Sequence, residues 1–125
     1  MTSWKFLVVE DESDSMELVS GLLDHEGIGS IEAHTGEEAL DVLKDTVPTL
    51  ILIDLALPGI DGWKVLASIK KISSLSSVPR VAMTAYHSAE LAHKALEAGF
   101  DAYFAKPIDA ASFIEDLKVV VRDHK

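Results

Sequence analysis

The strongest constraint on the fold is a regular alternation between short aliphatic runs and amphipathic segments. Short runs rich in Val, Ile, Leu and Phe are typical of buried strands, and apolar side chains at helical spacing lie between them. The expected strands cover residues 6–9, 28–34, 50–53, 81–83 and 102–105. Strands that alternate with helices form parallel sheets. The sequence therefore predicts an α/β domain, with a five-stranded parallel sheet covered by helices on both faces.

The helix boundaries are marked by capping and breaking residues. Thr35 and Glu38 form a capping-box pattern at the start of one expected helix. The other expected helix starts are Asp61, Ser88 and Asp109, and the residues expected to end helices are Gly27, Pro48 and Gly99. The serine-rich residues 73–77 are expected to form a loop.

Composition excludes several classes of protein. The chain of 125 residues has 21 acidic and 11 basic residues, a net charge of −10, whereas autonomous nucleic-acid binding relies on clustered Lys and Arg. It has no cysteine, which excludes disulfides and thiolate catalysis. The longest apolar runs fall far short of the ~20 residues that span a bilayer, and the first five residues lack the long apolar core of a signal peptide. We expect a single cytoplasmic domain with no membrane insertion.

The acidic excess is uneven along the chain. Residues 1–62 carry 14 acidic and 2 basic residues, whereas residues 63–125 carry 7 and 9. One explanation is a solubilising acidic surface. The other is that some of these acids converge on a cation, and only their positions relative to the strands can separate the two.

Chemically complementary residues follow four of the expected strands. Glu10 and Asp11 follow the first, Asp54 the third, Thr84 the fourth and Lys106 the fifth. Right-handed crossovers bring the carboxyl ends of parallel strands to one edge of the sheet, where such sheets bind ligands. If the first and third strands are neighbours, three carboxylates share one small space. Their mutual repulsion favours a hard divalent cation such as Mg²⁺.

Each of these residues also has an ordinary structural explanation. Acids that follow a strand are commonly helix caps, which is the role we expect for Glu12, Asp14 and Glu17. A lone Asp54 would be a turn residue. As a set, however, acids, a hydroxyl and a lysine suit the stabilisation of a phosphoryl group in transfer, with Asp54 as the carboxylate nucleophile.

Four sequence blocks resemble the receiver domains of two-component response regulators. They are residues 8–12 (VVEDE), 54–62 (DLALPGIDG), 83–85 (MTA) and 106–107 (KP). The resemblance runs from about residue 6 to about residue 121. It implies a flavodoxin-like, doubly wound (βα)5 fold with strand order 2-1-3-4-5. Residues 1–125 would form one receiver domain, with a core of about residues 5–122 and no effector domain, like the stand-alone receivers of chemotaxis and cell-cycle regulation.

The resemblance also implies a role for each site residue. Asp54 would be the phosphoacceptor. Mg²⁺, or Mn²⁺ in its place, would be bound by Asp11, Asp54, the backbone carbonyl of Ala56 and, through water, Glu10. Lys106 would bind the phosphoryl group, and the bond between Lys106 and Pro107 would be cis. Thr84 would move to hydrogen-bond the phosphoryl group, and Tyr103 would turn inward when it does.

The partners follow from the same resemblance. The phosphoryl group would come from a phosphohistidine on a sensor histidine kinase or a histidine phosphotransfer protein. The phosphorylated protein would bind a target, or relay phosphate, through the face of the fourth helix, fifth strand and fifth helix, with Val119 as a contact. It would be a monomer or a weak homodimer. It would act as a signalling switch and not as an enzyme.

Three other functions compete with this one. An aspartate-nucleophile phosphatase of the haloacid dehalogenase type needs a second acid at position 56, which is Ala56. A flavodoxin-like redox protein needs a phosphate loop where the acids at 10–12 stand. A degenerate receiver that only binds protein would lack part of the site. Two features depart from the common receiver pattern: Glu10 replaces a frequent Asp, and Ala56 and Tyr86 occupy positions that influence hydrolysis. The histidines show no ligand spacing.

Overall fold

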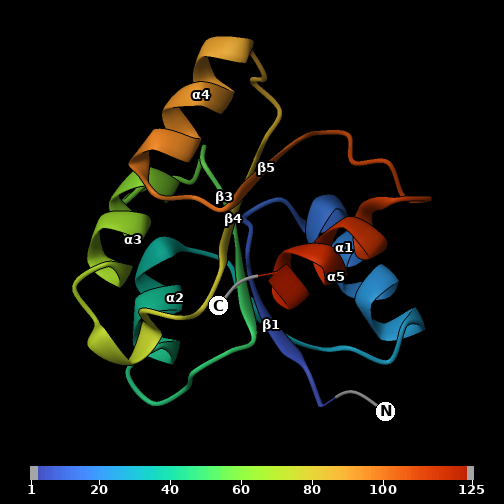
Figure 1. Ribbon diagram of the computed structural model, residues 1–125, viewed down its shortest axis with the longest axis horizontal. Coiled ribbons are helices and arrows are strands. Elements are labelled where there is room, and N and C mark those ends of the chain that lie inside the picture. The colour runs from blue at the N-terminus through green and yellow to red at the C-terminus, as the bar shows by residue number, and fades with distance from the viewer. Residues whose placement is uncertain (1–2, 124–125) are drawn as a thin grey trace.

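The computed structural model describes residues 3–123, whose five strands form one parallel sheet (Figure 1). The strands are β1 (Lys5–Val9), β2 (Gly29–Ala33), β3 (Leu50–Asp54), β4 (Arg80–Thr84) and β5 (Ala102–Ala105). Their order is β2-β1-β3-β4-β5, and every pairing is parallel. The predicted doubly wound fold, with strand order 2-1-3-4-5, is confirmed.

Five helices cover the two faces of this sheet. They are α1 (Ser13–His25), α2 (Gly36–Val42), α3 (Gly62–Ile69), α4 (Ala89–Ala98) and α5 (Phe113–Asp123). Helices α2, α3 and α4 lie on one face and α1 and α5 on the other (Figure 1). Each face has its own apolar cluster, because successive residues of a strand point to opposite sides.

Strand β3 is the centre of the fold. All five of its residues are buried, and it pairs with β1 on one side and β4 on the other. A strand buried on both faces needs a continuous aliphatic sequence, which explains the run before Asp54. Asp54 is the last residue of the strand, in register with Met83 of β4. The central position of β3 therefore places Asp54 in the middle of the carboxyl edge.

The predicted helix caps are confirmed at three positions. The side chains of Thr35, Asp61 and Ser88 each accept a hydrogen bond, at 3.0 Å, from the backbone N–H three residues later. The Glu38 carboxylate accepts from the backbone N–H of His34, at 2.8 Å, which is one residue before the cap. Gly99 follows α4 with φ of 122°, so a residue without a Cβ suits this helix end.

Three boundary predictions were wrong. Helix α5 begins at Phe113, because Asp109 caps a separate turn through the N–H of Ala111 and the last helix starts only after it. Helix α2 ends at Val42, well before Pro48, in turns of residues 43–45. The serine-rich segment contains a short 3-10 helix, Ser73–Leu75, whose Leu75 is buried.

None of the helices in the described part of the chain combines the length and the apolar character needed to cross a membrane.

The cis bond between Lys106 and Pro107 is present as predicted.

Substitution of Gly62 by alanine tests how tightly α3 packs beneath Asp54. A Cβ at Gly62 would lie 2.6 Å from the backbone oxygen of Asp54 and 2.7 Å from Cα of Leu55. Backbone atoms cannot yield as a flexible side chain can, so we expect Gly62→Ala to lower the free energy of unfolding by about 1–3 kcal/mol. Urea unfolding measures this change.

The matched control is Gly21→Ala, in the middle of α1. A Cβ there meets no atom within 4 Å. Since alanine favours a helix interior over glycine, this variant should gain about 0.5–1 kcal/mol. Equal stability of the two variants would contradict the close contact at Gly62.

Candidate functional site

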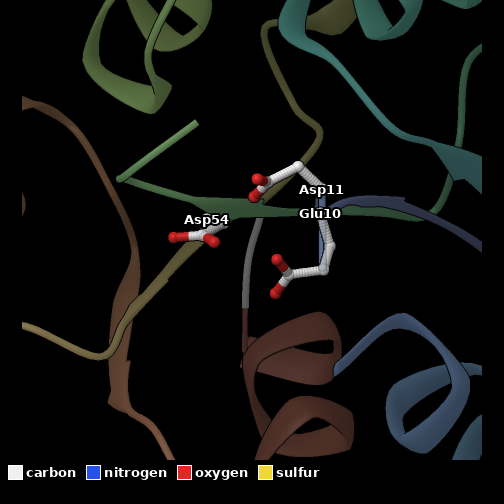
Figure 2. Close-up of side chains that lie close together, drawn as sticks. All are labelled: Glu10, Asp11 and Asp54. Atoms are coloured by element: carbon white, nitrogen blue, oxygen red, sulfur yellow. The ribbon is translucent and has the colours of Figure 1, made fainter. Parts of the chain in front are cut away.

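Three carboxylates meet at the carboxyl edge of the sheet. Glu10 and Asp11 directly follow β1, and Asp54 ends the neighbouring β3. Figure 2 shows their side chains grouped around the ends of the two strands, and one oxygen from each lies within 4.8 Å of the others. The structure thus brings together the acids that the sequence placed after separate strands.

Lys106 joins this group from the end of the sheet's edge strand, β5. Its Nζ lies 3.1 Å from Oδ2 of Asp54 and 3.4 Å from Oε1 of Glu12, and it also contacts Oε1 of Glu10. Burial lowers the pKa of this lysine, but its close contacts with the charged carboxylates of Glu10 and Asp54 outweigh burial and raise the pKa. Lys106 is therefore a permanent positive charge among the carboxylates.

Glu10 is the most constrained of the three acids. Its side chain is fully buried, and burial is the main cause that raises its pKa to about 7. Oε2 accepts a hydrogen bond from the backbone N–H of Glu12 at 3.1 Å. Oε1 touches Nζ of Lys106 without the angles of a hydrogen bond, and no other group within residues 3–123 supplies one. A buried oxygen in this position is under-satisfied.

Asp54 is held by its own strand end. Oδ1 accepts a hydrogen bond from the backbone N–H of Ala56 at 3.0 Å, while Oδ2 faces Lys106. The hydrogen bond from Ala56 orients the Asp54 carboxylate toward the pocket. Asp11, in contrast, is exposed.

The donor set fits a hard divalent cation. Only one lysine contacts this group of three carboxylates in the described residues, and a buried oxygen of Glu10 has no hydrogen bond. Mg²⁺ is bound in proteins by a few carboxylates together with water and other oxygens. Asp11 and Asp54 each offer a carboxylate oxygen to such a cation, and Glu10 offers one from a more deeply buried position.

A pocket of about 170 Å³ opens beside these carboxylates. It is lined by Asp11, Glu12, Asp54, Ala56, Ala85, Tyr86 and Lys106. Its size and its charged lining suit a small anion together with a cation. The Tyr86 side chain is 74% exposed and forms part of the rim.

Thr84 ends β4 close to this pocket. Its side chain is buried, and its hydroxyl accepts a hydrogen bond from the backbone N–H of Tyr86 at 3.2 Å. The backbone N–H of Lys106 donates to the Thr84 carbonyl at 2.9 Å. The threonine is therefore joined to both the lysine and the loop that follows β4.

Tyr103 lies on β5, outside the acidic pocket. Its hydroxyl is 3.2 Å from Nδ1 of His87, and the two ring centroids are 5.5 Å apart. Burial raises the pKa of this tyrosine. Nothing in the sequence indicated a role for His87, because a lone histidine in a loop has no recognisable ligand spacing. Another histidine, His124, lies outside the described residues.

A second pocket, of about 160 Å³, lies against the first helix. It is lined by Asp14, Ser15, Leu18, Val19, Met83, Lys106, Pro107 and Ile108. Lys106 lines both pockets. An apolar surface therefore adjoins the charged site.

Comparison with known proteins matches this geometry to one family. Residues 6–118 match the model of the response regulator receiver domain. The polar-differentiation response regulator DivK of Brucella ovis is 33% identical over 117 residues, which cover 94% of this chain and 95% of DivK.

Solved structures agree with this assignment. The CheY-like receiver domain protein of Methanospirillum hungatei JF-1 superposes with a TM-score of 0.88 at 26% identity, over 98% of this chain and 96% of that one. A two-component response regulator of Clostridium difficile gives 0.86 at 27% identity, over 97% and 98%. The chain belongs to the response regulator receiver domain family of two-component signalling.

Proposed function

We propose that this protein is a phosphorylation-controlled signalling switch with Asp54 as the phosphoacceptor. The observation that carries the proposal is the meeting of Glu10, Asp11 and Asp54 at one edge of the sheet, where Lys106 contacts Glu10 and Asp54. Asp11, Asp54, the carbonyl of Ala56 and, through water, Glu10 would hold Mg²⁺ or Mn²⁺. A bound cation would offset charge on the phosphoryl oxygens.

The donor would be a phosphohistidine on a sensor histidine kinase or a histidine phosphotransfer protein. An Asp54 oxygen forms a bond to phosphorus as the phosphorus–nitrogen bond breaks, and the imidazole keeps the electron pair of that bond. The products are an acyl phosphate and a neutral histidine, when the other ring nitrogen carries a proton. Lys106, 3.1 Å from Oδ2 of Asp54, stabilises the incoming phosphoryl oxygens.

The donor protein would dock beside the site. Leu18 is 44% exposed and lines the pocket between α1 and the segment after β5, together with Pro107 and Ile108. An apolar surface next to a charged reaction site supports the binding of a partner that carries the phosphohistidine.

Phosphorylation would change the face formed by α4, β5 and α5. The modification replaces one negative charge by nearly two and adds acceptor oxygens. Thr84 would exchange its bond to Tyr86 N–H for a bond to the phosphoryl group, and Tyr103 would turn inward. The exposed Val119 and Leu96 would be contacts for a target, a relay partner or a second copy in a weak dimer.

A phosphatase of the haloacid dehalogenase type is the weaker alternative. Such an enzyme needs an acid/base two residues after its nucleophile, and Ala56 lines the pocket there. The methyl group cannot move a proton. The groups around Asp54 support a protein that accepts one phosphoryl group and whose phosphorylated form carries the signal.

Asp54→Asn tests the phosphoacceptor directly. With acetyl phosphate and Mg²⁺, the wild-type protein should gain one phosphoryl group, and Asp54→Asn should gain none because an amide is not a nucleophile for this reaction. Intact-mass spectrometry measures the uptake. Asp61→Asn is the control, since Asn also caps a helix, and it should be labelled normally. Labelling of Asp54→Asn at the wild-type level would refute the assignment.

The raised pKa of Glu10 predicts a pH-dependent stability. Its pKa rises from an ordinary value of 4.5 to about 7, so the folded protein binds more protons than the unfolded chain within that window. The contribution of Glu10 to the free energy of unfolding therefore falls as pH rises through the window. Relative to Glu10→Gln, the metal-free wild type should lose up to about 3 kcal/mol between the two pKa values.

Urea unfolding across this pH range, with and without Mg²⁺, measures the effect. Added Mg²⁺ should reduce the difference between wild type and Glu10→Gln, because a cation favours the ionised carboxylate. Parallel stability curves for the two proteins in the absence of metal would contradict the burial of a titrating Glu10.

Thr84→Ala tests the proposed coupling. The variant should still accept phosphate on Asp54, because its nucleophile and cation ligands are unchanged. The response at Tyr103 should be much reduced, since the side chain that would bind the phosphoryl group is gone. ¹⁹F NMR of 3-fluorotyrosine-labelled protein measures this response. A full response at Tyr103 in phosphorylated Thr84→Ala would discard the coupling.

A further inference from the structure

The contact between His87 and Tyr103 is part of neither the apolar core nor the phosphoacceptor site. His87 lies in the segment between β4 and α4, and its Nδ1 is 3.2 Å from the hydroxyl of Tyr103 on β5. The rings are tilted by 43° with centroids 5.5 Å apart. His87 is exposed, so no core packing requires an imidazole at this position.

The register of the sheet places Tyr103 on the same face as Thr84. Tyr103 is in register with Ala82, and Thr84 with Ala105. Residues two apart on a strand point to the same side, so Thr84, Ala82 and Tyr103 share one face of the sheet. Tyr103 packs against the apolar cluster on that face. Ala82 and Ala105 have small side chains, so the ring of Tyr103 has neighbours of low volume.

One short segment holds the hydroxyls of both side chains. The N–H of Tyr86 donates to Oγ1 of Thr84, and the next residue, His87, contacts the hydroxyl of Tyr103. Ser88 then caps α4 through the N–H of Leu91. A change at Thr84 therefore acts on consecutive residues that lead into α4.

We infer that His87 is a latch that holds Tyr103 in its present position, against His87, until Thr84 changes its hydrogen bond. This inference rests on the proposed function, because it concerns the switch that Asp54 would operate. Release of Thr84 Oγ1 from Tyr86 frees the backbone of the segment, and His87 withdraws from Tyr103 as the segment moves. His87 is a positioning residue, since it touches neither the phosphoryl site nor its ligands.

The latch predicts that its removal shifts the resting protein toward the activated form. An equilibrium between the position of Tyr103 beside His87 and its inward position would move by about two- to fivefold when one partly exposed hydrogen bond is lost. The same factor should appear as tighter binding of beryllofluoride with Mg²⁺, because a ligand that favours one state binds better when that state is already populated.

The test compares His87 variants by ¹⁹F NMR of 3-fluorotyrosine-labelled protein. The chain has two tyrosines, and the Tyr103 signal is the one that Tyr103→Phe removes. In the unmodified protein, His87→Ala and His87→Phe should move the Tyr103 signal toward its position in wild type saturated with beryllofluoride and Mg²⁺. His87→Asn keeps a polar group near the place of Nδ1 and should stay close to wild type.

His93→Ala is the matched control. His93 is also an exposed histidine, on α4, where it pairs with Glu97 at 3.4 Å and not with Tyr103. Its removal should leave the Tyr103 signal and the beryllofluoride affinity unchanged. A shift as large as that of His87→Ala would mean that any loss near α4 disturbs the ring, and it would overturn the latch.

The outcomes separate this inference from the proposed function. A wild-type Tyr103 signal that responds to beryllofluoride, with an unshifted signal in His87→Ala, would overturn the latch and leave the switch standing. Equal shifts in His87→Asn and His87→Ala would refute the hydrogen bond as its basis. A wild-type protein that does not respond to beryllofluoride at all would overturn both.

Discussion

Repulsion among the carboxylates at the carboxyl edge of the sheet is the interaction on which the rest of the structure depends. Glu10 and Asp54 are almost entirely buried there, and Asp11 lies beside them. Such an arrangement is costly unless cations compensate it, because desolvation and like charges both disfavour the ionised forms. The protein supplies one cation at this place, Lys106, and burial still raises the pKa of Glu10 to about 7.

The surrounding fold accommodates this repulsion among the carboxylates. Strands β1 and β3 pair with each other in the interior of the sheet, so the carboxylates lie at the ends of two buried strands. Lys106 instead comes from β5, an edge strand whose residues are only partly buried. Thr84 and the following segment occupy the space between the two. Glu10 and Asp54 thus lie at the ends of buried strands, whereas Lys106 follows a strand that is less buried.

Much of this arrangement could be predicted, because local chemistry and topology agree. The aliphatic run before Asp54 specifies a fully buried strand, and the caps at Thr35, Asp61 and Ser88 fix where helices begin. The predicted start of α5 was wrong. Asp109 caps a turn that precedes the helix, and no local pattern indicates that α5 begins only at Phe113. The His87 contact was missed because its partner lies sixteen residues away on another element.

The sequence by itself determined the class of fold and the identity of the groups at the carboxyl edge. Periodicity and breakers are local properties, and right-handed crossovers then leave few topologies. Only the tertiary structure decided the balance of charge among these groups. Burial of Glu10, the three contacts of Lys106 and the packing of His87 on Tyr103 depend on distances between segments far apart in the chain. Electrostatic energy depends on those distances and on exclusion of water, which no local pattern of residues records.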